Sequence, residues 1–97
     1  MSSPGYVWEK MFVAVHCLCG EGTFKKRIAD ATTAALIRLN DEDLDGDLAQ
    51  DLKFILDRTK RNMKAGIIQR DFDELERDEL IKRMLHVLAE TTGSERS

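Results

Sequence analysis

The fold is decided by residues 6–19, which read YVWEKMFVAVHCLC. Apolar side chains recur in this stretch at the three- and four-residue spacing of an α-helix, and they comprise Trp8, Met11, Phe12, Val15 and Leu18 with Cys19. The other sides of the helix are also largely apolar. A helix that is apolar around its circumference lies at the centre of a bundle or is covered by a partner chain, and the sequence leaves both alternatives open.

Both ends of this first helix are marked in the sequence. Ser3 can cap the N-terminus, and Pro4 suits the first helical position, where no backbone N–H is needed. Gly20 suits the left-handed conformation that closes a helix, and Gly22 follows it. We therefore expect the first helix to span the whole apolar run.

Apolar stripes at the same spacing predict three further helices, over residues 24–39, 47–64 and 71–91. Thr23 is a good N-cap for the first of these. The last one changes phase near residues 76–79, which indicates a kink or a separate first turn. Its buried face is predicted to comprise Phe72, Leu75, Ile81, Met84, Leu85 and Leu88.

The whole pattern predicts an all-α protein, either a small four-helix bundle or an orthogonal helical domain. The length fits one domain over residues 1–97, and the polar residues 92–97 are expected to form a frayed tail. Leu44 is expected to plug the core, and residues 67–70 to form a packed apolar connector. No stretch carries a strand signal of useful length.

Composition places the chain among folded globular proteins, because 42% of its residues are apolar and 34% are charged. The formal net charge of −3 gives no support for a general polyanion binder or a binder of anionic membranes. Residues 1–10 lack the basic start of a signal peptide, and the apolar run 11–19 is too short to span a bilayer. Two cysteines do not make a disulfide framework, so we expect a cytoplasmic protein with reduced thiols.

The acidic connector 41–47, DEDLDGD, resembles the first half of an EF-hand calcium loop. Its candidate ligands are Asp41, Asp43 and Asp45, and Gly46 would allow the sharp turn. The position of the bidentate glutamate is occupied by Leu52, so the calcium reading is weak. The alternative is that these acids stabilise the start of the next helix through its dipole and free N–H groups.

Catalysis and metal binding have little support elsewhere in the sequence. His16, Cys17 and Cys19 could act as soft metal ligands, but within one turn of a helix they point in different directions. Adjacent helical side chains do not face each other, so a Cys–His catalytic pair is not expected either. We expect no enzyme activity and no cofactor.

A basic cluster at the end of the third predicted helix supports an alternative function. It comprises Arg58, Lys60, Arg61 and Lys64. These side chains could bind phosphates in a nucleic-acid-binding regulator. The same helix begins with acids, where base contacts would be made, and basic residues near a helix C-terminus also complement its dipole. Nucleic acid is therefore the less favoured partner.

Surplus hydrophobicity gives the leading hypothesis. Phe54, Leu80 and Val87 lie off the main stripes of their helices, and the first helix is apolar on nearly every side. Exposed apolar patches on small proteins usually mark an interface. We therefore expect a helical interaction or accessory protein that binds a protein partner or itself. The interface candidates are Trp8, Met11, Phe12, Val15 and Phe54.

The first half of the chain also carries a resemblance. Its elements are Trp8, Ala14-Val15, Arg27-Ile28-Ala29-Asp30-Ala31, Leu36, Leu39 and Glu42-Asp43-Leu44. This arrangement resembles that of short all-helical bacterial proteins of unassigned function. The resemblance implies that Glu-Asp-Leu marks the start of the next helix, which favours the interpretation of the acidic connector without calcium. It implies no catalytic residue.

Overall fold

The computed structural model of the protein describes residues 4–92. Within this range the fold is all-α, as the sequence predicts, apart from one very short hairpin. The helices are α1 (Pro4–Leu18), α2 (Phe24–Ala34), α3 (Gly46–Arg58) and α4 (Glu74–Thr91). Short segments join them: the 3-10 turns η1 (Leu36–Arg38), η2 (Asp41–Asp43) and η3 (Lys60–Asn62), and the strands β1 (Met63–Lys64) and β2 (Ile67–Ile68).

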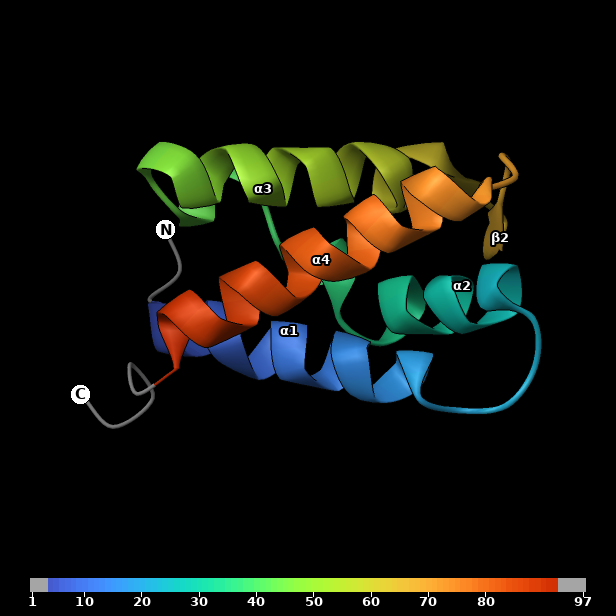
Figure 1. The fold of residues 1–97 in the computed structure, drawn as a ribbon, viewed down its shortest axis with the longest axis horizontal. Helices are drawn as coiled ribbons and strands as arrows, with labels where there is room; N and C mark the ends of the chain where they lie inside the picture. Colours follow the sequence, from blue (N-terminus) through green and yellow to red (C-terminus); the bar gives the residue numbers. More distant parts are fainter. Residues whose placement is uncertain (1–3, 93–97) are drawn as a thin grey trace.

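Helix α4 packs against helices on both sides of the molecule. Figure 1 shows α1 and α2 side by side, with α3 on the opposite side and α4 running diagonally between α1 and α3. Both α1 and α3 pack against α4, and α1 also packs against α2. Because α4 contacts both layers, it joins the α1–α2 pair to α3. None of the helices within residues 4–92 is long and apolar enough to cross a membrane.

The core lies where these helices meet. Each helix contributes one row of fully or almost fully buried side chains at helical spacing. The rows are Val7, Met11, Ala14 and Leu18 on α1; Ile28 and Ala31 on α2; Leu52, Ile55 and Leu56 on α3; and Leu80, Met84 and Val87 on α4. Leu44 is buried between η2 and α3, which confirms its predicted place in the core.

The predicted buried face of α4 is right at Met84 and wrong at several other positions. Leu80 and Val87, which the sequence places off the stripe, are fully buried, whereas Leu75 and Leu85 are 82% and 47% exposed. The phase is wrong because α4 has two neighbouring apolar rows, and its packing against both α1 and α3 selects the row centred on Met84. Helical periodicity defines a face only to about one row when adjacent rows are equally apolar.

Two predicted helices end earlier than expected. The backbone of Ala35 leaves the helical region at φ −143°, so α2 stops at Ala34 and η1 covers the remaining predicted turn. α3 ends at Arg58, since Thr59 adopts φ −116° and ψ −90°.

A hairpin of two short strands, each of two residues, replaces the end of the predicted third helix. Met63 pairs with Ile68 and Lys64 with Ile67. The turn between them needs two left-handed residues, Ala65 at φ 54° and Gly66 at φ 78°. The hairpin buries Ile68 in the core and leaves Ile67 exposed, so the predicted packed connector is half right.

The N-terminus of α4 lies three residues beyond the predicted one. Asp73 caps it by accepting a hydrogen bond from the backbone N–H of Glu76 at 2.7 Å. Phe72 precedes the cap and contacts the ring of Phe24 edge to face, with centroids 5.5 Å apart. The predicted Ser3 cap and the tail beyond residue 92 lie outside the described residues, whereas Thr92 itself is held by a hydrogen bond to Leu88.

Candidate functional site

An apolar surface covers the side of the α1–α4 pair next to the buried rows. We call it the α1–α4 face, and it comprises Trp8, Phe12 and Val15 on α1, Cys19 directly after α1, and Ile81, Leu85 and Leu88 on α4. On each helix these residues follow the core row by one position, so helical geometry places them on one flank. Phe12 is 50% exposed and Leu85 47% exposed. The face therefore exposes large apolar side chains to solvent.

A groove runs along this face between the two helices. It has a volume of about 260 Å³ and is lined by Val15, Leu18, Cys19, Ile81, Met84 and Leu85. Its lining is almost entirely apolar in chemistry, with the Cys19 thiol at one end. An apolar groove flanked by exposed apolar side chains is the usual form of a site that receives a partner side chain.

The N-terminal end of the face is held in place by an aromatic pair. The rings of Trp8 and Phe12 stack with centroids 5.2 Å apart and planes inclined by 22°. Nε1 of Trp8 donates to Oγ1 of Thr92 at 3.3 Å, which ties the start of α1 to the end of α4. Because the Trp8 ring is fixed in this way, the exposed ring of Phe12 rests on an ordered neighbour.

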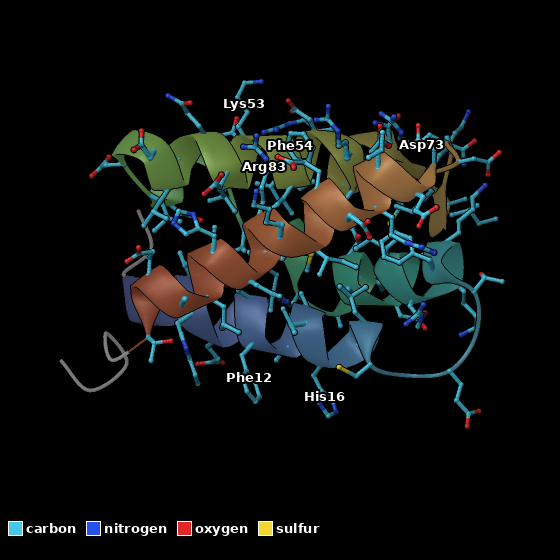
Figure 2. The ribbon with its side chains drawn as sticks, viewed as in Figure 1. Phe12, His16, Lys53, Phe54, Asp73 and Arg83 are labelled. Carbon is cyan, nitrogen blue, oxygen red and sulfur yellow. The ribbon has the colours of Figure 1, made fainter. Side chains whose placement is uncertain are left out.

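Two of the five predicted interface residues do not lie on this surface. Met11 is fully buried in the core. Phe54 lies between α3 and α4, where the guanidinium carbons of Arg58 and Arg83 are 3.6 and 4.3 Å from its ring centroid. Figure 2 shows Phe54 and Arg83 together at this crossing. Trp8, Phe12 and Val15 lie on the α1–α4 face, where the interface stays a prediction, and the sequence analysis did not include the residues that α4 contributes to this face.

A charged crevice lies on the other flank of α4, facing α3. It has a volume of about 310 Å³ and is lined by Asp51, Glu79, Lys82, Arg83 and His86. Asp51 is the centre of the cluster, since its Oδ1 accepts from Nη1 of Arg83 at 3.0 Å and its Oδ2 lies 2.5 Å from Nδ1 of His86. Arg83 also donates through Nε to Glu79 at 2.8 Å.

Electrostatics in this crevice favour a protonated imidazole. The hydrogen bond to Asp51 raises the pKa of His86 above its usual value, and the charges of Asp51 and Glu90 act in the same direction. The five lining residues include no hydroxyl or thiol group. The contacts of Asp51 with Arg83 and His86 link α3 to α4.

The predicted basic cluster is largely engaged within the molecule. Arg58 stacks on Phe54, and Lys60 donates to the carbonyl of Leu39 and to Oδ1 of Asn40 at 3.2 Å. Arg61 contacts Asp57 at 2.6 Å and Asp41 at 3.0 Å. Lys64 lies apart from these residues on β1 and is exposed. The structure therefore divides the four cations among several contacts instead of presenting one basic patch.

The residues of the predicted calcium loop also have separate roles. Oδ2 of Asp43 accepts from the backbone N–H of Asn40 at 2.9 Å and so caps η2. Asp41 pairs with Arg61, and Asp45 is the N-cap residue of α3 and is exposed. Within residues 4–92, no three His, Cys, Asp or Glu side chains gather closely enough to hold a metal ion. The helix-start interpretation therefore fits Asp43, which caps the turn η2, and the position of Asp45, which makes no side-chain cap hydrogen bond to α3.

The thiols and the first histidine point to different surroundings, as helix geometry requires. Cys17 is half-buried, Cys19 is exposed at the groove, and both are free. His16 is exposed, and Figure 2 shows it pointing away from the body of the protein on the same side as Phe12.

No protein-family model, curated protein or solved structure matches the chain. The resemblance to bacterial helical proteins thus stays a prediction.

Proposed function

We propose that the protein is a small helical interaction or accessory protein that associates with protein surfaces, its own included, through the α1–α4 face. The observation that carries this proposal is the apolar groove between α1 and α4, bordered by the half-exposed side chains of Phe12 and Leu85. Aromatic and large aliphatic side chains in a water-excluding patch are what dominates the energy of protein interfaces.

The dimensions of the groove favour a protein partner over a small molecule. Its volume of about 260 Å³ is below the range of roughly 300–1,000 Å³ typical of small-molecule sites. It also lacks the few converging polar groups that orient such ligands, because its lining is almost wholly apolar. A partner side chain, anchored by a surrounding interface, fits this site better.

The test is the state of association of matched leucine variants. Leu85 and Leu75 are both exposed leucines on α4, but only Leu85 borders the groove. Sedimentation velocity over about 1–100 µM, the range of weak to moderate affinities, is expected to show self-association of the wild type and of Leu75→Glu. Leu85→Glu is expected to stay monomeric, because it places a charge on the apolar face.

Circular dichroism and thermal unfolding of both variants control for folding. A wild-type protein that remains monomeric throughout this range would contradict self-association. Equal association of the Leu85→Glu and Leu75→Glu variants would show that the α1–α4 face is not the site of contact.

A further inference from the structure

We propose that the α1–α4 face binds an amphipathic helix of another protein, one whose apolar side chains are bordered by lysine and arginine. This contact rests on the proposed function and adds the chemistry of the partner to it. The shape of the groove favours a helix as the occupant, and the charges around the face favour a basic helix.

The groove has the dimensions of one face of a short helix. Its two walls are themselves helices, and its lining is apolar along its length. From Phe12 to Cys19 the α1 side of the face covers seven residue steps, or about 10 Å at the rise of an α-helix. A partner helix with apolar anchors at positions i, i+4 and i+7 covers the same length. Such a helix fits between α1 and α4 and contacts the exposed side chains of Phe12 and Leu85.

Two acids continue the line of the face along α4. Glu74 and Asp78 precede Leu85 by eleven and seven residues, and both spacings return to the same side of an α-helix. Both acids are exposed, and neither side chain makes an ion pair or hydrogen bond with another described residue. They lie one turn apart, where like charges repel each other. A cationic group of a partner would relieve this repulsion.

Two more acids lie at the ends of the α1 side of the face. Glu9 precedes Phe12 by one turn, and Glu21 follows Cys19 by two residues. Glu9 lies 3.7 Å from Lys10, but its side chain is 65% exposed. Glu21 is exposed and makes no ion pair with another described residue. Acidic side chains thus border the face on both helices.

The lysine and arginine side chains of these two helices do not balance the acids. Lys10 and Arg77 lie over aromatic rings, at 5.2 and 5.9 Å from the centroids, and Lys82 and Arg83 line the crevice that faces α3. These four are all the lysines and arginines of α1 and α4. His16 is the one further basic side chain on the exposed side of α1. The border therefore complements a partner that carries positive charge.

Two other occupants fit these charges less well. A second copy of the chain would add the same acids to the contact, so we expect self-association to be weaker than binding of a basic helix. An anionic membrane requires a basic border around the apolar face of a helix. Both occupants are outcomes of the test below.

Two synthetic peptides of about 18 residues, the length of a five-turn helix, test the chemistry of the partner. Both carry leucine at the i, i+4 and i+7 positions, and the flanking positions hold lysine in one peptide and glutamate in the other. Trp8 lies on the face and is the only tryptophan of the chain, so its fluorescence reports binding. The lysine peptide is expected to bind with a dissociation constant of about 1–100 µM. The glutamate peptide is expected to bind at least about tenfold more weakly.

Charge reversal at matched acids locates the contact. Asp78→Lys is expected to raise the dissociation constant of the lysine peptide about tenfold, because an attraction becomes a repulsion. Glu42→Lys, at an exposed acid on η2 beside α3, changes the net charge equally and is expected to change the constant less than about twofold. Asp78→Asn removes the charge without reversing it and is expected to give an intermediate constant. Circular dichroism verifies the fold of each variant.

The outcomes separate the basic-helix contact from the proposed function. Equal weakening by Asp78→Lys and Glu42→Lys would overturn the contact, because attraction to the whole acidic protein would then explain the binding. Equal affinity of the two peptides, or no binding of either up to about 100 µM, would also overturn it. In these cases the proposed function stands if the wild type self-associates and Leu85→Glu does not. A wild type that stays monomeric, binds neither peptide and sediments with vesicles of phosphatidylcholine and phosphatidylserine would contradict both.

Discussion

Nδ1 of His86 on α4 lies 2.5 Å from Oδ2 of Asp51 on α3, and the other oxygen of the same carboxylate accepts a hydrogen bond from Arg83. One acidic side chain thus joins Arg83 and His86 of α4 to α3. The Asp51 side chain is largely buried, with 14% exposed, whereas the imidazole is about half exposed. The contact therefore stabilises the α3–α4 packing while its proton remains in exchange with solvent.

Stability is expected to fall as the pH rises through the titration of His86. The folded protein holds the proton more tightly than the unfolded chain does, because the hydrogen bond to Asp51 raises the pKa of His86 above its ordinary value. The contribution is fully present below the unfolded value of about 6.5 and is lost as the pH passes the raised folded value. Urea unfolding between pH 5.5 and 8.5 measures it.

His86→Gln is the control for this pH dependence. Glutamine keeps a hydrogen-bond donor but does not titrate, so the decline in stability between these pH values is expected to be smaller in the variant than in the wild type. The neighbouring groups Glu79, Lys82, Arg83 and Glu90 are unchanged in the variant. An identical pH profile for the two proteins would contradict the role of His86.

Truncation of two neighbouring residues on α4 is expected to have opposite outcomes. Met84→Ala removes a fully buried side chain from the core and should lower the free energy of unfolding by about 2–5 kcal/mol. Leu85→Ala removes a half-exposed side chain and should cost less than about 1 kcal/mol in the monomer. Chemical denaturation at low protein concentration measures both, and equal losses would contradict the assigned phase of α4.

The sequence does not determine which face of α4 is buried. Helix content, the all-α class and the burial of Leu44 follow from apolar spacing and are confirmed. Spacing alone could not choose between the rows of α4 centred on Met84 and on Leu85, since both rows are apolar. The choice depends on which neighbour α4 packs against, and that is a tertiary property.

The candidate site was predicted in part for the same reason. Trp8, Phe12 and Val15 were recognisable because α1 has more apolar side chains than one buried face needs. The sequence pattern assigns Ile81 and Leu85 to the core and so does not identify them as neighbours of these residues. The cluster around Asp51 and His86 joins residues 35 positions apart, and no local pattern marks such a pair.

The two acids of the connector are expected to differ in their effect on stability. Asp43→Ala removes the acceptor of the Asn40 backbone N–H and should cost about 1 kcal/mol, as loss of a capping side chain does. Asp45 makes no side-chain cap hydrogen bond to α3, so Asp45→Ala should cost no more than a few tenths of a kcal/mol. Thermal unfolding measures the difference.

Calcium is expected to leave the melting temperature of the wild type unchanged. A calcium-dependent rise that Asp45→Ala removed would contradict the helix-start interpretation.

Two basic residues that follow α3, Arg61 on η3 and Lys64 on β1, are expected to differ in their effect on stability. Arg61 contacts both Asp57 and Asp41, and its hydrogen bond to Asp57 is the main cause that raises the pKa of Arg61 above its ordinary value. Because its side chain is 41% exposed, Arg61→Gln should lower stability by no more than about 1 kcal/mol. Lys64→Gln, the matched loss of one charge on exposed β1, should leave stability unchanged.

Salt distinguishes an ion-pair effect from a packing effect in the same pair of variants. The difference in unfolding free energy between Arg61→Gln and Lys64→Gln is expected to shrink between about 0.05 and 0.5 M salt, because exposed ion pairs are screened over this range. A difference that persists at high salt would assign the loss to packing of the arginine side chain instead. A phosphate ligand that used Arg61 would have to compete with Asp57 and Asp41. Its affinity is therefore expected to be higher for an Asp41→Asn variant than for the wild type. A mobility shift with a short DNA duplex measures that change.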